Sequence, residues 1–189
     1  VAGSNEMADR VRKYARGDVY VVPDPVGAPG SAPAVFQRDT SLMRLLKGIM
    51  PGGVKPNPLR LVWYGHPSNF NPLIPWVDSL LAAEWPVPII LWVVTQPHPN
   101  IQAWSESVSQ RRPGVITVDV IEWGEEAQWD IVRDANVVLL PSDPSDLKKS
   151  VKTANRLIDA LAMGRYVIAS KLPTYLEFSD HVSLVEGGP

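Results

Sequence analysis

The sequence contains no cysteine, which excludes a disulfide framework and metal sites built from thiolates. It also has no run of about 18 consecutive apolar residues, the length that a membrane-spanning helix needs. The first residues lack the charged-then-apolar pattern of a secretory signal peptide. From these absences together we expect a cytoplasmic protein without a transmembrane segment.

A basic excess, which is typical of nucleic-acid-binding domains, is missing as well. The chain has 18 Lys and Arg against 20 Asp and Glu, a net charge of −2, so nucleic acid is not an expected partner. The charge is unevenly spread, because residues 59–189 carry 10 basic and 15 acidic side chains, yet residues 142–171 carry six basic and three acidic ones. A basic stretch inside an acidic segment favours a small anionic ligand.

Several motifs of nucleotide and catalytic sites are absent. After the first predicted strand the residues read GHPSNFN, where a dinucleotide-binding protein would have G-x-G-x-x-G. No G-x-x-x-x-G-K-[ST] phosphate loop and no G-x-S-x-G nucleophile elbow is found. The three histidines are widely scattered, so no metal site is expected. Because the dinucleotide motif is missing too, no other cofactor is expected.

Alternating strand and helix patterns are present instead. We predict strands at residues 59–65, 88–95, 115–121, 136–141, 166–170 and 182–186, and helices at 73–83, 101–110, 125–135 and 152–163. This alternation is typical of an α/β fold with a doubly wound parallel sheet. We assign residues 59–189 to that domain, 1–23 to a helix and a short strand, and 24–58 to a Pro/Gly-rich linker.

The likeliest ligand site is the crevice where the strand order reverses, because ligands of open α/β sheets bind there. For the common order 3-2-1-4-5-6, the loops at residues 65–71 and 142–151 face each other. The second loop opens the helix predicted at 152–163, on which Lys152, Asn155, Arg156 and Asp159 recur at steps of three and four. These side chains either bind an anion at the helix start or are solvated charges with Asp159 as their local partner.

Further candidates lie at the ends of other predicted strands. Gly65 would let a ligand approach the backbone closely, and His66 is a phosphate donor or merely an exposed side chain. Asn69 either binds the ligand or caps the next helix. Trp123 could border a base ring or pack at the rim, and Glu177 could reach a sugar hydroxyl or lie on the surface.

Three stretches of the chain carry a family resemblance: NVVLLPSD, NRLIDALAMGRYVIAS and PTYLEF. They resemble the donor-binding C-terminal half of GT-B glycosyltransferases, especially family four of the retaining enzymes. GSNEMADRV and DVYVVPDPV, within residues 1–27, resemble the end of that family's N-terminal domain. The resemblance implies a Rossmann-like domain, a nucleotide-sugar donor without a metal, an acceptor-binding domain upstream, and a ribose contact for Asp159.

The sequence departs from the family pattern at two places. The first of two family glutamates falls on Val151, and the arginine and lysine expected after the first strand are replaced by His66 and asparagines. Lys152 and the Asn155–Arg156 pair resemble a subgroup with the phosphate contacts at the helix start. Two functions stay open: the donor-binding domain of a glycosyltransferase, inactive alone, or a non-catalytic binding and scaffolding domain.

Two weaker expectations complete the prediction. A methyltransferase is a third possibility, although Thr95 and Gln96 stand where that class has an acidic residue. Residues 1–23 could also pair with a neighbouring copy in a homodimer.

Overall fold

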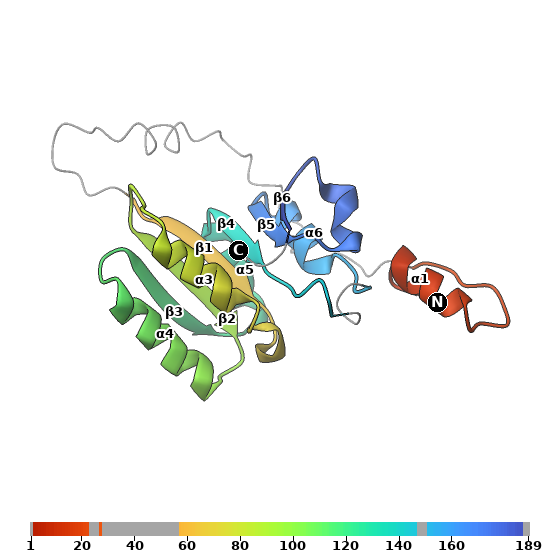
Figure 1. The fold of residues 1–189 in the computed structure, drawn as a ribbon, viewed down its shortest axis with the longest axis horizontal. Helices are drawn as coiled ribbons and strands as arrows, with labels where there is room; N and C mark the ends of the chain where they lie inside the picture. The colour runs from red at the N-terminus through yellow and green to blue at the C-terminus, as the bar shows by residue number, and fades with distance from the viewer. Residues whose placement is uncertain (1, 23–26, 28–56, 147–150, 187–189) are drawn as a thin grey trace.

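The computed structural model describes residues 2–22, 27, 57–146 and 151–186 of the chain. Its centre is a six-stranded sheet with the strand order β3-β2-β1-β4-β5-β6, and all five strand pairings are parallel (Figure 1). The strands are β1 (Leu59–Tyr64), β2 (Ile89–Thr95), β3 (Ile116–Glu122), β4 (Val137–Leu140), β5 (Tyr166–Ser170) and β6 (Ser183–Val185). The predicted doubly wound sheet is thus confirmed, and its strand order is the common one assumed in locating the site.

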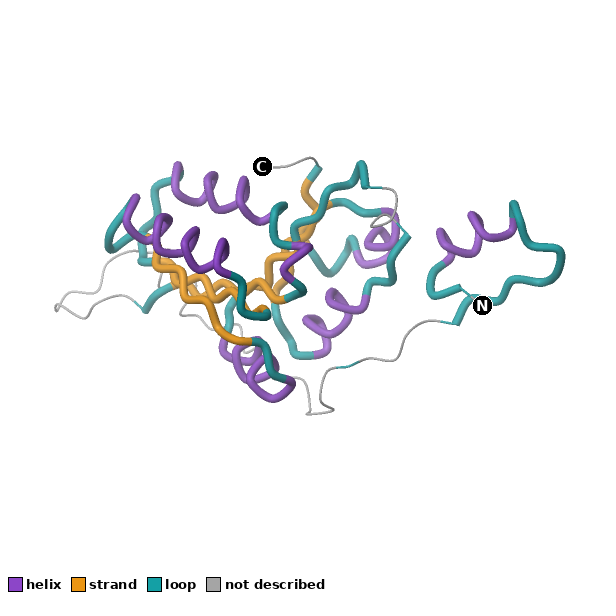
Figure 2. The backbone as a smooth tube through the Cα atoms, turned by 90° about the horizontal axis from the view of Figure 1, so that it is seen from below, coloured by secondary structure: helices purple, strands orange, loops and turns teal. Residues whose placement is uncertain are grey.

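Helices cover both faces of this sheet (Figure 2). The α-helices are α1 (Asn5–Arg12), α3 (Leu73–Ala82), α4 (Pro99–Arg111), α5 (Glu125–Asp134) and α6 (Asn155–Ala162). Two 3₁₀ helices follow β1 and β5, namely η1 (Pro67–Asn69) and η2 (Pro173–Phe178). Buried side chains of α3 and α4 join one apolar cluster, and those of α5 and α6 join the other.

Strand β1 separates the two clusters, because successive side chains of a strand point to opposite faces. Leu61 and Trp63 enter the cluster under α3 and α4, whereas Val62 and Tyr64 enter the cluster under α5 and α6. Each of these side chains is buried on its own face, and burial of such a side chain contributes about 1.5–3 kcal/mol. A strand covered on both sides therefore needs the nearly continuous apolar run that the sequence shows.

Helix α6 is shorter than the sequence predicts. The prediction of a helix from Lys152 is wrong, since α6 begins at Asn155. The carbonyl of Val151 accepts a hydrogen bond from Ser4 Oγ at 2.8 Å, and Val151 and Thr153 are β-branched residues, which disfavour helix. At the other end Gly164 adopts a positive φ of 67°, a conformation that glycine reaches without strain, and closes the helix.

The N-terminal segment, residues 2–22, lies beyond α6 at one end of the molecule (Figures 1 and 2). Ser4 caps α1 by accepting a hydrogen bond from the Met7 N–H at 3.1 Å. The strand predicted near residue 20 is reduced to one parallel bridge between Ala2 and Val21. Of the predicted linker only residues 27, 57 and 58 are described, and the rest lies outside the described residues. None of the described helices is both long and apolar enough to cross a bilayer.

Candidate functional site

A cavity of about 510 Å³ lies at the carboxyl ends of β1 and β4, where the strand order reverses. Four segments that are distant in sequence form it: the N-terminal segment, the loop after β1, the loop and helix after β4, and the turn after β5. The lining residues are Gly3, Met7, Asn69, Ser142, Lys152, Thr153, Asn155, Arg156, Leu172 and Tyr175. The position is the one where ligands of open parallel sheets bind.

Arg156 lines this cavity and is held by the end of β1. Its Nη1 donates a hydrogen bond to the Tyr64 carbonyl at 3.1 Å, and its own backbone carbonyl accepts one from the Tyr64 hydroxyl at 2.7 Å. A Cβ atom placed on Gly65 would lie 3.0 Å from Arg156 Nη1. The backbone at Gly65 is therefore closely approached by an arginine of the protein itself.

Two tyrosines flank Arg156 from the buried side. Burial, followed by the charge of Asp159, raises the pKa of Tyr64 far above its ordinary value, with Arg156 partly offsetting the rise. Burial likewise raises the pKa of Tyr175, and the charge of Arg156 and a hydrogen bond with it oppose the increase. Both hydroxyls therefore stay protonated at neutral pH, and the cation of Arg156 is not neutralised by a phenolate.

The remaining polar groups of the cavity suit an anion. Lys152 is exposed and Asn155 half-buried, and both line the cavity with the hydroxyl-bearing Ser142 and Thr153. Helix α6 has Ala154 at its N-cap and no side-chain cap hydrogen bond, and the positive end of its dipole favours a negatively charged ligand. Among the described lining residues none carries a carboxylate.

Asp159 is separate from this cavity, although the sequence pattern groups it with Lys152, Asn155 and Arg156. Its side chain is only 9% exposed, and its Oδ1 accepts a hydrogen bond from the Gly27 N–H at 2.8 Å. The carboxylate thus holds one described residue of the linker against α6. The alternative in which Arg156 is a solvated surface charge does not fit its contacts with the end of β1.

The structure brings Asn69, Lys152, Asn155 and Arg156 together in the cavity and Gly65 beside it, but places three other candidates elsewhere. His66 lines a second cavity with Trp104, and its Nδ1 accepts the Ser68 N–H at 3.2 Å, so it caps η1.

Trp123 lies outside both cavities, 48% exposed, and its indole N–H donates to Gln128 at 2.8 Å. Glu177 is exposed on η2 and lines neither cavity.

Six lining residues were not among the predicted ones: Gly3, Met7, Ser142, Thr153, Leu172 and Tyr175. Ser142 directly follows β4 and Tyr175 lies in the turn after β5. Their positions at strand ends could therefore have identified them as candidates for the site. Gly3 and Met7 precede the domain by more than fifty residues, and no local pattern connects them with the site. No three His, Asp or Glu side chains of the described residues are grouped to hold a metal ion.

Solved glycosyltransferase structures share this fold. WaaG, a glycosyltransferase involved in lipopolysaccharide biosynthesis, matches with a TM-score of 0.66 and 14% identity, over 98% of this chain and 48% of WaaG. A glycosyltransferase from Rickettsia africae matches with a TM-score of 0.67 and 14% identity, over 100% of this chain and 49% of that one. The chain has the fold of one half of a GT-B glycosyltransferase.

HepE from Anabaena, solved in complex with UDP and glucose, has the same GT-B fold, with a TM-score of 0.60 and 14% identity over 99% of this chain and 49% of HepE. This chain thus spans about half the length of the solved structures that it matches. No protein-family model and no curated protein matches its sequence. The family resemblance predicted from the sequence is confirmed at the level of the GT-B fold.

Proposed function

We propose that this GT-B half binds the nucleoside diphosphate part of a sugar donor in the cavity between β1 and β4. The observation that carries the proposal is the placement of Lys152 and Arg156 in one cavity at the N-terminus of α6. A diphosphate offers several anionic oxygens, which match two cations, a helix dipole and a set of hydroxyl and amide donors. HepE, whose structure contains UDP and glucose, supports this choice of ligand by its fold.

In a glycosyltransferase of this kind, negative charge develops on the departing diphosphate as the sugar leaves. The guanidinium of Arg156 is already oriented by the Tyr64 carbonyl, so it would stabilise that charge without rearranging. Lys152, which is exposed, would add a less oriented charge. An upstream domain would bind the sugar acceptor and supply the groups that activate it. The proposal requires no metal.

One observation favours the alternative of a non-catalytic binding domain. The described lining residues include no carboxylate, and Val151 occupies the place of the first family glutamate. A site of this composition binds an anion but has no side-chain carboxylate of its own for general acid or base catalysis. We therefore propose that the described domain supplies binding and leaving-group stabilisation, while sugar transfer requires a longer protein.

Isothermal titration with UDP, ADP, GDP and inorganic pyrophosphate tests the proposal. We expect saturable binding, and Lys152→Ala should weaken it about two- to fivefold, because an exposed ion pair contributes up to about 1 kcal/mol. Lys171→Ala is a matched control, since Lys171 belongs to the same basic stretch but pairs with Glu186 away from the cavity. Absence of saturable binding at millimolar concentrations of every probe would refute the proposal.

A further inference from the structure

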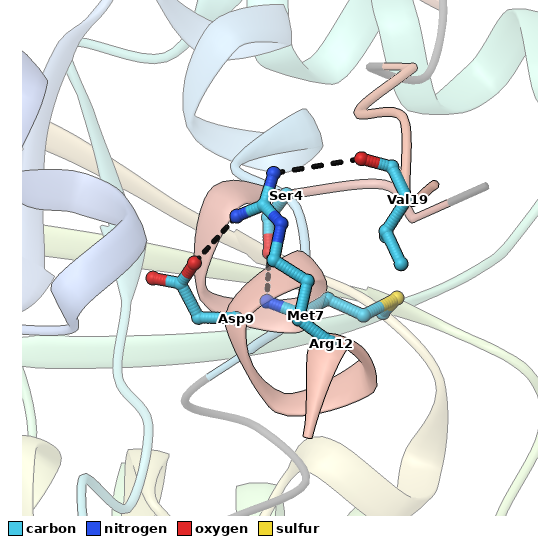
Figure 3. A network of polar contacts seen from close by, with 5 residues as sticks. All are labelled: Ser4, Met7, Asp9, Arg12 and Val19. Carbon is cyan, nitrogen blue, oxygen red and sulfur yellow. Dashed lines mark hydrogen bonds and ion pairs between the residues drawn. The ribbon is translucent and has the colours of Figure 1, made fainter. Parts of the chain in front are cut away.

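The N-terminal segment contacts the same loop that carries two of the cavity's polar side chains. Ser4 Oγ donates a hydrogen bond to the Val151 carbonyl at 2.8 Å, across 147 positions of sequence. The same oxygen accepts the Met7 N–H at 3.1 Å as the N-cap of α1, a contact drawn in Figure 3. One hydroxyl therefore ties the start of α1 to the residue that precedes Lys152.

Gly3 shows how closely the two segments approach. A Cβ atom built on Gly3 would lie 2.8 Å from Thr153 Cγ2, nearer than carbon atoms normally come. Only a residue without a side chain fits here unless the Thr153 side chain or one of the segments moves. Ala2, at 2% exposure, and Ala8, at 0%, are buried, and α1 contacts η2, so the segment packs against the domain.

We infer that residues 2–8 form part of the binding cavity and that Ser4 is a positioning residue for its ligand. Gly3 and Met7 line the cavity directly, and the Ser4 hydrogen bond fixes the backbone from which Lys152 and Thr153 extend. This inference rests on the proposed function, because it concerns the same nucleoside diphosphate. It adds that the site is completed by a segment more than fifty residues before β1.

Binding of UDP to four variants tests the inference. Ser4→Ala removes the hydrogen bond to Val151, and Gly3→Ala introduces a methyl group against Thr153 without changing any polar group. Loss of one hydrogen bond corresponds to about a two- to tenfold weaker affinity. We expect that rise in Kd for both variants, and recovery in Ser4→Thr, which keeps a hydroxyl at the helix cap.

Arg12→Ala is the matched control within α1. Arg12 pairs with Asp9 at 2.6 Å and bonds the Val19 carbonyl (Figure 3), and it does not line the cavity. Its loss should lower the stability of the segment slightly and leave the Kd for UDP unchanged.

If Ser4→Ala and Gly3→Ala bind UDP as tightly as the parent chain, the inference is overturned while the proposed function stands. An equal loss in Arg12→Ala would assign the effect to the stability of α1 and overturn it too. If the parent chain binds no UDP, ADP, GDP or pyrophosphate, the proposed function fails and the inference fails with it.

Discussion

Substitution of Gly65 by alanine should displace Arg156 from the cavity without touching its charge. Gly65 is not among the glycines with a positive φ, so alanine fits its backbone. The new methyl group would lie 3.0 Å from Arg156 Nη1 and 3.4 Å from Trp63 Cζ2. Trp63 is fully buried and cannot retreat easily, whereas the end of the arginine side chain can. We therefore expect the guanidinium to move and its 3.1 Å hydrogen bond to the Tyr64 carbonyl to break.

The size of the effect follows from that one hydrogen bond. A hydrogen bond to a charged group contributes about 1.5–3 kcal/mol when both partners are buried. Arg156 is half-buried, and water can replace part of the interaction, so a loss of about 1 kcal/mol is a reasonable expectation. This corresponds to an affinity for UDP that is about fivefold weaker and to a melting temperature about 2–4 °C lower for a domain of this size.

Titration calorimetry with UDP and thermal unfolding measure the two effects. Gly124→Ala is the control, because Gly124 also follows a strand and a Cβ there meets only Ala127 Cβ at an ordinary 3.8 Å. Combination with Arg156→Ala decides the mechanism. If Gly65→Ala acts through Arg156, the double variant should bind UDP no more weakly than Arg156→Ala alone. Additive losses, or unchanged binding in Gly65→Ala, would refute the reasoning.

Two further predictions concern buried groups near the site. Asp159→Ala should lower the free energy of unfolding by about 1–3 kcal/mol, because the Gly27 N–H loses its acceptor, as urea denaturation would show. The affinities of this variant for UDP and for pyrophosphate should change equally. A loss of affinity for UDP alone would indicate a ribose contact. The pKa values of Tyr64 and Tyr175 are raised in the folded state. The two protonated hydroxyls therefore contribute their full stability below the unfolded tyrosine pKa of about 10, and this contribution is lost as the pH rises above that value. Urea midpoints between pH 8 and 11 should fall less steeply in Tyr175→Phe, and an identical pH slope would contradict the assignment.

The sheet could be predicted from the sequence because its signals are local and redundant. β1 and β2 are almost entirely apolar, as strands covered on both faces must be. The position of the cavity also followed, since the strand order determines where the carboxyl ends of β1 and β4 meet. Asn69, Asn155 and Arg156 lie within a few residues of those strand or helix ends, and this proximity made them predictable.

Contacts between distant segments could not be predicted in the same way. The Val151 carbonyl, shortly before α6, accepts a hydrogen bond from Ser4, which lies 147 positions away. The helical pattern around Lys152 could not predict that hydrogen bond. The role of Gly65 also depended on a distant residue. Its missing side chain leaves room for Arg156, and sequence reasoning could only state that something approaches the backbone there.

Asp159 shows a limit of helical periodicity itself. Arg156 and Asp159 are three residues apart, so they share a side of α6 as the spacing predicts. Each residue advances a helix by about 1.5 Å, and Asp159 therefore lies almost one turn farther from the cavity than Arg156. There the carboxylate accepts a hydrogen bond from the Gly27 N–H, and its charge contributes to the raised pKa of Tyr64. Periodicity thus gives the direction of a side chain around the helix but not its distance from the edge of the sheet. For a ligand at that edge, the residues of the first turn are the ones that reach it.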